Sequence, residues 1–347
     1  MEKRATKTFF ILIVITLFFV MSTGCGKKKS SEPVSKTNIF MGTVCTIKIY
    51  DNPKEEYFQD TFNLINDIES KMSINVEDSE LIRVNNQAGK SKVKVSDDTF
   101  FVIQKGLEYS AISAGKFDIT IGPLVDLWSI GFDNQKVPKE EEIKEKIEFI
   151  DYKDLVLDQE TKEVYLNKEG MMIDLGAIAK GYTADAIKET LLKNNVKKAI
   201  INMGGNVLLV GSNIGNEDFK IGIQDPVSNK GNYVGIVSIK DKSIVTSGIY
   251  ERYIEQDGKR YHHLLNPFKG YPWENDIAGV SIISDKSIDG DALSTTVFSM
   301  GVKDGFDFIE NIENVEAIFI TKDKEIILTK GIKDSFKLTN DTYKIIQ

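Results

Sequence analysis

The second half of the chain is a succession of short apolar segments separated by turn residues. Segments of this kind predict strands joined by hairpins, and they occupy residues 198–211, 219–226, 233–248, 252–267 and 277–285. Apolar residues at helical spacing occur in other parts of the chain, at 57–74, 98–115, 138–151, 177–195 and from about 289. Because strands and helices are segregated, we expect an α+β fold with mixed or antiparallel sheets and packed helices in one large unit.

Three further segments extend this prediction. Residues 38–51 alternate as a strand does, and residues 155–176 predict two short strands followed by a third. Residues 115–133 contain several glycines and a central proline, so we expect an ordered loop there. Gly204 and Gly205 interrupt an apolar segment and indicate a strand bulge.

The N-terminus has the organisation of a secretory signal. Basic residues precede an apolar run from Phe9 to Met21, and Gly24 and Cys25 follow it in a pattern similar to a bacterial lipobox. We therefore expect a signal peptide over 1–24, a lipid on Cys25, a polar tether over 25–37 and a catalytic domain over 38–347. The domain would lie at the outer face of the cell membrane. An uncleaved anchor is the alternative.

Cysteine content and charge exclude several classes of protein. If Cys25 carries a lipid, Cys45 has no partner for an intramolecular disulfide, so the fold depends on its apolar core. The net charge of −8 argues against binding to nucleic acid, which requires a basic face. No serine nucleophile elbow, zinc-binding helix or paired-cysteine motif is present.

Residues 287–301 are one candidate for chemistry. With Asp289 as the helix N-cap, Asp291 falls in the first turn and Thr295 lies four residues later on the same face. Oxygen ligands at a helix N-terminus suit Mg²⁺ held beside a phosphate. A capped helix in which Thr295 bonds to its own backbone is the more common explanation of this spacing.

A second candidate is the segment 171–187, in which a strand pattern ends at Asp174 and a glycine-containing turn begins a helix. A strand, a turn and a helix N-terminus form a frequent phosphate-binding arrangement. Lys180 is placed to meet a phosphate there, although a surface lysine on a helix is the commoner case.

The chain contains only two histidines, and they are adjacent. His262 and His263 end a strand pattern before a turn. Histidine is suited to proton transfer near neutrality. Adjacent side chains of a strand face opposite ways, so one of the two is expected to have a structural role.

Taken in order, the motifs FMGT, GKFDITIGPLVDLW, MIDLGAIAKGYTAD, INMGGN, IGIQDP, SGIYERY, YHHLLNP and GDALSTTVFSMG span residues 40 to 301. Together they closely resemble the ApbE family of FAD:protein FMN transferases. The resemblance implies an enzyme that binds FAD and Mg²⁺, joins FMN through its phosphate to a threonine or serine hydroxyl of a target protein, and releases AMP.

The resemblance also implies roles for individual residues. Metal ligands fall on Asp291, Thr295 and the carbonyl of Ala177, with Ser294 adjacent. His263 falls on the family's histidine, which we interpret as the base. The positions that match FAD contacts are Met41, Lys116, Phe117, Asp118, Asp174, Lys180 and Leu265.

Two other functions stay open at this point. The chain has Asn75 near a position where many such transferases carry an aromatic residue, and a looser hold on the flavin favours an Mg²⁺-dependent FAD pyrophosphatase that releases FMN and AMP. A flavin-binding lipoprotein without turnover is the third interpretation. The expected acceptors are subunits of redox-driven ion pumps or extracellular electron-transfer proteins.

Overall fold

The computed structural model describes residues 32–228 and 231–347. Residues Pro33–Gln347 form one compact unit. The expected signal peptide, the lipidation site Cys25 and most of the expected tether lie outside the described residues. Within the described ranges, no helix combines the length and the hydropathy needed to cross a membrane.

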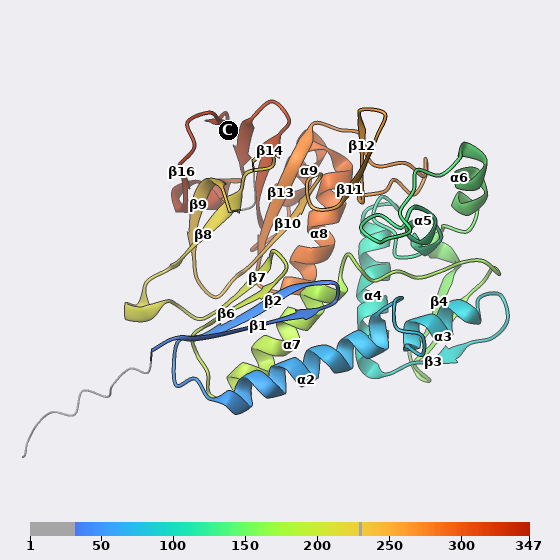
Figure 1. Cartoon of the computed structure of the whole chain (residues 1–347), viewed down its shortest axis with the longest axis horizontal. Helices are drawn as coiled ribbons and strands as arrows, with labels where there is room; N and C mark the ends of the chain where they lie inside the picture. Colours follow the sequence, from blue (N-terminus) through green and yellow to red (C-terminus); the bar gives the residue numbers. More distant parts are fainter. Residues whose placement is uncertain (1–31, 229–230) are drawn as a thin grey trace, which may run out of the picture. The chain divides into compact units, whose positions relative to one another are not determined.

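A nine-stranded sheet forms the centre of the compact unit (Figure 1). Neighbouring strands pair antiparallel, except that the last two are parallel. In spatial order the strands are β1 (Val34–Phe40), β2 (Thr43–Ile49), β6 (Ala199–Met203), β7 (Asn206–Val210), β10 (Ser243–Gly248), β13 (Ile277–Ser284), β14 (Glu316–Thr321), β15 (Glu325–Leu328) and β17 (Lys344–Ile345). The prediction of an α+β fold with mixed sheets is confirmed.

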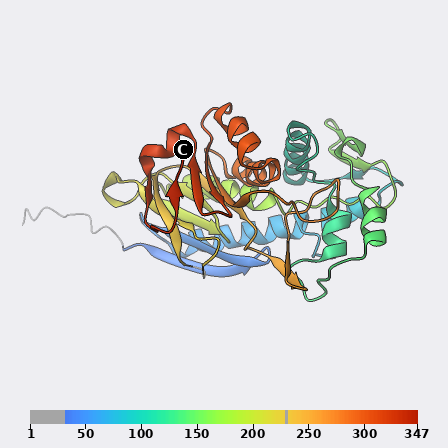
Figure 2. The same cartoon turned by 90° about the horizontal axis from the view of Figure 1, so that it is seen from above.

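Both faces of this sheet are covered at its central strands, which is why every residue of β13 is buried. One face contacts the helices α7 (Ala179–Lys193), α8 (Ser287–Met300) and α9 (Val302–Glu310), and Figure 2 shows the orange helices α8 and α9 on one side of the strands. The other face shares an apolar cluster with a second sheet. Its strands are β8 (Phe219–Gln224), β9 (Tyr233–Ile239) and β16 (Phe336–Leu338).

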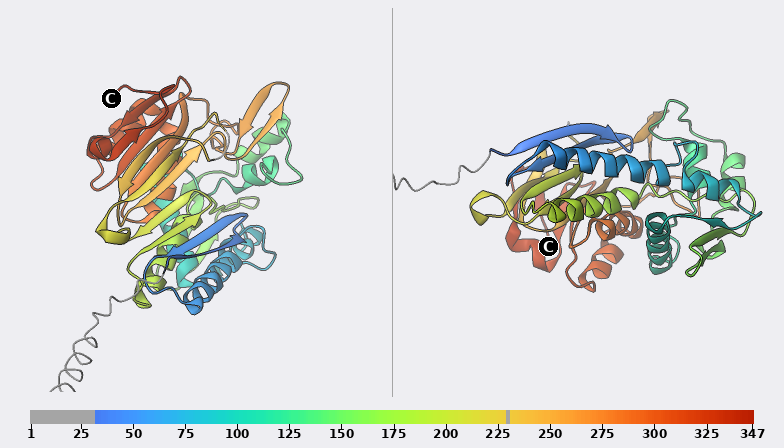
Figure 3. Two further views of the ribbon diagram at one scale, coloured as in Figure 1. Left: turned by 60° about the vertical axis from the view of Figure 1, so that its left-hand side comes forward. Right: turned by 90° about the horizontal axis from the view of Figure 1, so that it is seen from below.

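The helix α2 (Glu55–Met72) packs alongside α7, as the right-hand view of Figure 3 shows. Next along the chain come α3 (Glu80–Asn86), α4 (Asp97–Ile112), α5 (Gly122–Trp128) and α6 (Glu140–Ile147), together with a small sheet of β3 (Val93–Lys94), β5 (Glu163–Leu166) and β4 (Leu155–Asp158). Short 3₁₀ helices occupy Tyr152–Asp154, Ile214–Asn216 and Lys330–Ser335.

One hairpin stands apart from these sheets. It consists of β11 (Tyr253–Gln256) and β12 (Lys259–His262), which pair only with each other in the described part of the chain. Arg252 immediately precedes the hairpin and His263 immediately follows it. The backbone N–H of His263 donates to the carbonyl oxygen of Arg252 at 3.1 Å, so these two residues are tied together at its base.

The structure differs from the sequence prediction in several elements. The segment 115–133, which was expected to be a loop, contains the helix α5. Pro123 is compatible with this helix because it lies in the first turn, where its missing N–H costs no hydrogen bond. The third strand expected before residue 176 is absent from the described structure, where Met172 forms only an isolated bridge with Ile121. The sequence patterns did not indicate α3 or α9.

Two boundaries also differ. Strand β1 begins at Val34 rather than near residue 38, since residues 34–37 pair with β2. Gly204 and Gly205 are not a bulge within a strand. They form the two-residue turn between β6 and β7, and both have positive φ, as a tight hairpin requires.

Candidate active site

The N-terminal halves of α7 and α8 approach each other closely at Gly181. A Cβ at this position would lie 2.3 Å from the carbonyl oxygen of Ser287, so the two backbones can meet only because residue 181 is glycine. The N–H of Gly181 donates to Oδ2 of Asp291 at 2.8 Å. The contact therefore fixes the Asp291 side chain against the start of α7.

Helix α8 begins at Ser287, three residues before the start that an N-cap at Asp289 would give, so Asp289 is not its N-cap. The N-cap position is Lys286, whose side chain makes no capping bond. The cap comes instead from Asp185 on α7, whose Oδ1 accepts the N–H of Ser287 at 2.8 Å and whose Oδ2 accepts that of Ile288 at 2.9 Å. Asp291 is consequently the fifth residue of α8.

The proposed metal ligands supply oxygen atoms of three kinds. Asp291 is buried, which raises its pKa, while the positive charge of Lys180 and the Gly181 N–H lower it. Its Oδ1 accepts no hydrogen bond from the described residues. Thr295 lies one turn further along α8, with its hydroxyl 3.5 Å from that of Ser247. Ala177 lies in the turn before α7, where its carbonyl is the donor the resemblance implies.

This donor set suits Mg²⁺, which prefers hard oxygen ligands and retains places for water or phosphate. In the described ranges, no three histidine, cysteine, aspartate or glutamate side chains come together as a metal cluster. A cation at Asp291 would therefore depend on hydroxyl, carbonyl and substrate oxygens. Ser294 is the less available hydroxyl, because it bonds to the Asp291 carbonyl and to Ser247, both at 2.8 Å.

The turn from Asp174 to Lys180 is held by its own hydrogen bonds. Oδ1 of Asp174 accepts the N–H of Gly176 at 2.7 Å, and Nζ of Lys180 donates to the Gly176 carbonyl at 2.9 Å. Burial raises the pKa of Asp174, whereas the Gly176 bond and the charges of Lys180 and Arg252 lower it. Both positive side chains are thus within electrostatic range of this carboxylate.

Met41 lies in the turn between β1 and β2, with the positive φ of 49°. Its N–H donates to Oε1 of Glu69 on α2 at 2.9 Å, and its sulfur accepts the hydroxyl of Thr183 on α7 at 3.6 Å. The turn is therefore fixed against the helix that carries Lys180.

The run Lys116, Phe117 and Asp118 adjoins this region through the bond from the Asp174 N–H to the Ile119 carbonyl at 2.8 Å. Phe117 is buried against Tyr109. The Asp118 carboxylate accepts bonds from Thr120 and from the Tyr152 N–H. The fold already uses both of these side chains, so Phe117 and Asp118 can offer a ligand only their backbone groups. Lys116, in contrast, is partly exposed.

Leu265 is buried in a separate apolar cluster with Trp128 and Leu124. The turn that follows Leu265 packs against Gly115, since the Phe268 ring lies 3.4 Å from where a Cβ of Gly115 would be. This contact brings the Leu265 turn next to Lys116.

The two histidines occupy different environments. His262 is buried, with its ring edge-on to Phe298 and Nε2 bonded to the Trp273 carbonyl at 3.0 Å. His263 is partly exposed, and its Nδ1 lies 3.2 Å from the carbonyl oxygen of Arg252. Because a carbonyl only accepts, Nδ1 carries the proton and Nε2 is left as the basic nitrogen.

Burial lowers the pKa of His263 to about 3, partly opposed by the bond to Arg252. His262, Arg252 and Lys180 lower it further through their charges. The imidazole is therefore neutral at pH 7. An anionic ligand beside Arg252 and Lys180 would offset their charge and raise the basicity of Nε2.

Lys180 connects most of these groups, because its charge acts on Asp174, Asp291 and His263 alike. Sequence reasoning missed Arg252, Asp185 and Gly181 as site residues. Asp185 and Gly181 lie in the GYTAD motif and Arg252 in SGIYERY, so both motifs were recognised without a role for these members.

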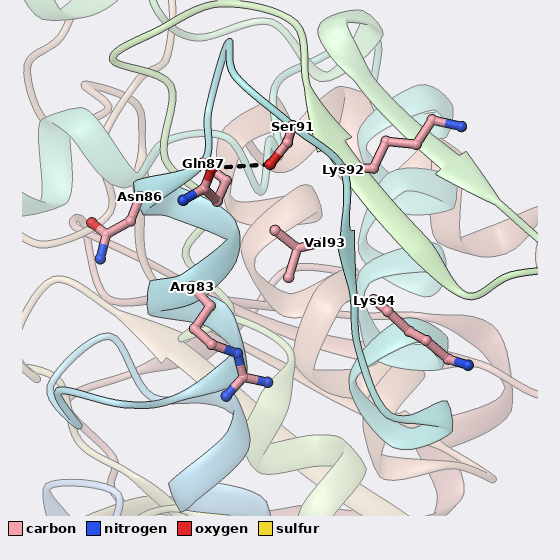
Figure 4. A pocket seen from close by; sticks show the side chains of 7 residues that line it. All are labelled: Arg83, Asn86, Gln87, Ser91, Lys92, Val93 and Lys94. Carbon is pink, nitrogen blue, oxygen red and sulfur yellow. Dashed lines mark hydrogen bonds between the residues drawn. The ribbon is translucent and has the colours of Figure 1, made fainter.

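A hollow of about 450 Å³ lies between α3 and β3 (Figure 4). It is lined by Arg83, Asn86, Gln87, Ser91, Lys92, Val93 and Lys94. None of the predicted site residues belongs to this lining, so we place the candidate active site at α7 and α8 rather than here.

The fold and the site together define a class of protein: an α+β unit in which the N-terminal halves of two helices meet at a buried carboxylate, with the positively charged side chains of Lys180 and Arg252 and a neutral histidine nearby. The chain matches the family model described as "ApbE family" over residues 41–319. It belongs to the ApbE family.

Individual relatives agree with this assignment. The FAD:protein FMN transferase of Klebsiella pneumoniae is 38% identical over 90% of this chain and 96% of that protein. The FAD:protein FMN transferase of Treponema pallidum is 33% identical over 90% of this chain and 91% of that protein. The crystal structure of the ApbE protein from Thermotoga maritima has a TM-score of 0.81 and 28% identity, covering 88% of this chain and 99% of that chain.

Proposed function

We propose that the chain transfers FMN from FAD to a threonine or serine hydroxyl of a target protein and releases AMP. The observation that carries this proposal is the contact that holds Asp291 against the start of the helix bearing Lys180, together with the neighbouring His263, whose Nδ1 proton is held by a carbonyl. Family membership and relatives named FAD:protein FMN transferase support it.

In the proposed reaction, the acceptor hydroxyl attacks the phosphorus of the FMN half of FAD. A P–O bond forms, the pyrophosphate P–O bond breaks, and AMP leaves with the electron pair. Nε2 of His263 takes the hydroxyl proton as the bond forms. Lys180 contributes positive charge where the pyrophosphate must lie, which reduces its repulsion of the incoming oxygen.

Asp291, Thr295 and the Ala177 carbonyl would hold Mg²⁺ in this site. When bound, the cation would neutralise phosphate charge and improve AMP as a leaving group. Asp291 would orient it from a fixed position, because the Gly181 N–H already holds one carboxylate oxygen.

The test is AMP release by the full chain with FAD, Mg²⁺ and an acceptor carrying the pattern D-x-x-[ST]-G-A-[ST]. The proposal predicts AMP formation that requires the acceptor hydroxyl, requires Mg²⁺ and is lost in Asp291→Asn. AMP formation at the same rate without acceptor would instead establish the FAD pyrophosphatase. Tight FAD binding with no AMP in either case would establish the flavin-binding protein without turnover.

We also propose that Cys25 is lipidated and anchors the enzyme at the outer face of the cell membrane, where its acceptors would be ion-pump subunits or extracellular electron-transfer proteins. The motif at residues 24–25 and the basic residues that follow support this placement. Fractionation of cells expressing Cys25→Ser tests it. An undiminished membrane-bound fraction would contradict lipid anchoring through this residue.

A further inference from the structure

Arg252 is a cation without an anionic partner in the described part of the chain. The other two arginines in these ranges each lie beside a carboxylate: Arg83 is 3.8 Å from Glu80, and Arg260 is 2.9 Å from Glu255. The Arg252 guanidinium forms neither an ion pair nor a hydrogen bond with any described residue. A guanidinium that binds none of the described residues is available to a ligand.

The position of this side chain is nevertheless well defined. Its Cδ lies 3.0 Å from where a Cβ of Gly131 would be, and Nη2 lies 3.8 Å from where a Cβ of Gly42 would be. Both glycines have positive φ. The aliphatic stem therefore runs over Gly131, and the guanidinium ends beside the turn that contains Met41.

The backbone of Arg252 is fixed to the candidate base. Its carbonyl oxygen accepts both the N–H and the Nδ1–H of His263, at 3.1 and 3.2 Å. Its positive charge opposes the rise in the pKa of Asp174 that burial causes, and it adds to the lowering of the pKa of His263 by burial. The Arg252 guanidinium is thus close enough to Asp174 and His263 to affect their charge states.

We propose that Arg252 binds a phosphate of the FAD pyrophosphate, an inference that rests on the proposed function and adds a residue to it. A planar guanidinium matches two phosphate oxygens, and charge-assisted bonds of this kind are stronger than neutral ones. Lys180 is less free to take this role alone, because its Nζ already donates to the Gly176 carbonyl.

The test compares ligands with and without phosphates. Flavin fluorescence of the full chain gives the dissociation constants of FAD and riboflavin in EDTA, so that no cation contributes. We expect Arg252→Gln to weaken FAD binding about tenfold to a hundredfold and to leave riboflavin binding unchanged. Arg252→Lys keeps the positive charge but loses the planar guanidinium, so its dissociation constant for FAD should lie between those of Arg252→Gln and the wild type.

Arg260→Gln is the matched control, since Arg260 belongs to the same hairpin but pairs with Glu255. It should bind FAD as the wild type does. An Arg252→Gln protein that binds FAD within twofold of the wild type would overturn the proposal. Equal losses for FAD and riboflavin would also overturn it, because they indicate a structural role.

The outcomes separate this inference from the proposed function. If the wild type transfers FMN while Arg252→Gln binds FAD normally, only the Arg252 assignment fails. If the wild type shows the predicted Arg252 dependence of FAD binding and transfers no FMN, the site still recognises the pyrophosphate and the proposed transfer fails.

Discussion

The two histidines show how neighbouring residues of one type acquire different roles. Strand β12 ends at His262, and consecutive side chains of a strand point to opposite sides. His262 consequently packs into the core against Phe298, while His263 lies at the base of the hairpin and is bonded through Nδ1 to a carbonyl. The prediction that His262 has the structural role agrees with its buried position, and the catalytic role of His263 stays a prediction.

Exchange of each histidine for glutamine tests this division. We expect His263→Gln to lower the rate of FMN transfer about a hundredfold or more, because the group that takes the hydroxyl proton is lost. His262→Gln is the control, and its transfer rate should stay within a few-fold of the wild type. Single-turnover AMP release at saturating FAD measures both. Equal rates for His263→Gln and the wild type would refute the assignment.

His262 also predicts a pH dependence of stability. Burial lowers its pKa from 6.5 to about 4, so between these values the unfolded chain binds a proton that the folded chain does not. Stability from this residue is therefore present above about pH 6.5 and decreases as the pH falls toward 4. Each pKa unit corresponds to about 1.4 kcal/mol, so the expected loss is about 2 kcal/mol at pH 5.

Urea unfolding at pH 7.5 and at pH 5 measures this effect. The free energy of unfolding of His262→Gln should change less between the two pH values than that of the wild type. The comparison of the two proteins is needed because other groups titrate in the same range, including Asp185, whose pKa is raised to about 6 by burial. Identical changes in both proteins would show that His262 is not responsible.

At the scale of elements, the pair α7 and α8 constructs the site. Gly181 allows the close approach, Asp185 caps α8, and the Gly181 N–H orients Asp291. Each contact joins residues about a hundred positions apart in the chain, such as Asp185 and Ser287. A local N-cap is absent, so the start of α8 depends on its neighbour.

Removal of the Asp185 carboxylate should loosen this start. We expect Asp185→Ala to lower the free energy of unfolding by about 1 kcal/mol, since two N–H groups lose their cap, and Asp185→Asn, which keeps one acceptor, to lower it less. Hydrogen exchange adds a local measurement, because the amides of Ser287 and Ile288 should exchange faster. Unchanged exchange at both amides in Asp185→Ala would contradict the capping role.

The same elements show what local patterns could and could not predict. Helices α2, α4 and α7 follow from apolar spacing, which is a local property. The cap of α8 was assigned wrongly to Asp289, because the residue that caps it lies on another helix. Arg252 was missed because its significance depends on the absence of a partner, which is visible only once the fold places the carboxylates.

For the whole molecule, the segregation of strands and helices along the sequence predicted the α+β class. This prediction was correct because several strands that are neighbours in the sequence also pair antiparallel in the sheets. The order of the strands in the sheet was beyond prediction. Strand β2 pairs with β6, which follows it by about 150 residues, and this long-range pairing places the Met41 turn beside α7. The site therefore depends on contacts between residues far apart in the chain.

The proposed reaction attaches FMN covalently to a protein hydroxyl. Intact-mass spectrometry tests it most directly, on an acceptor with the pattern D-x-x-[ST]-G-A-[ST] incubated with the full chain, FAD and Mg²⁺. We expect the acceptor to gain the mass of one FMN minus one water, and replacement of its threonine to abolish the gain. An acceptor of unchanged mass, in a reaction where FAD has been converted to free FMN and AMP, would contradict it.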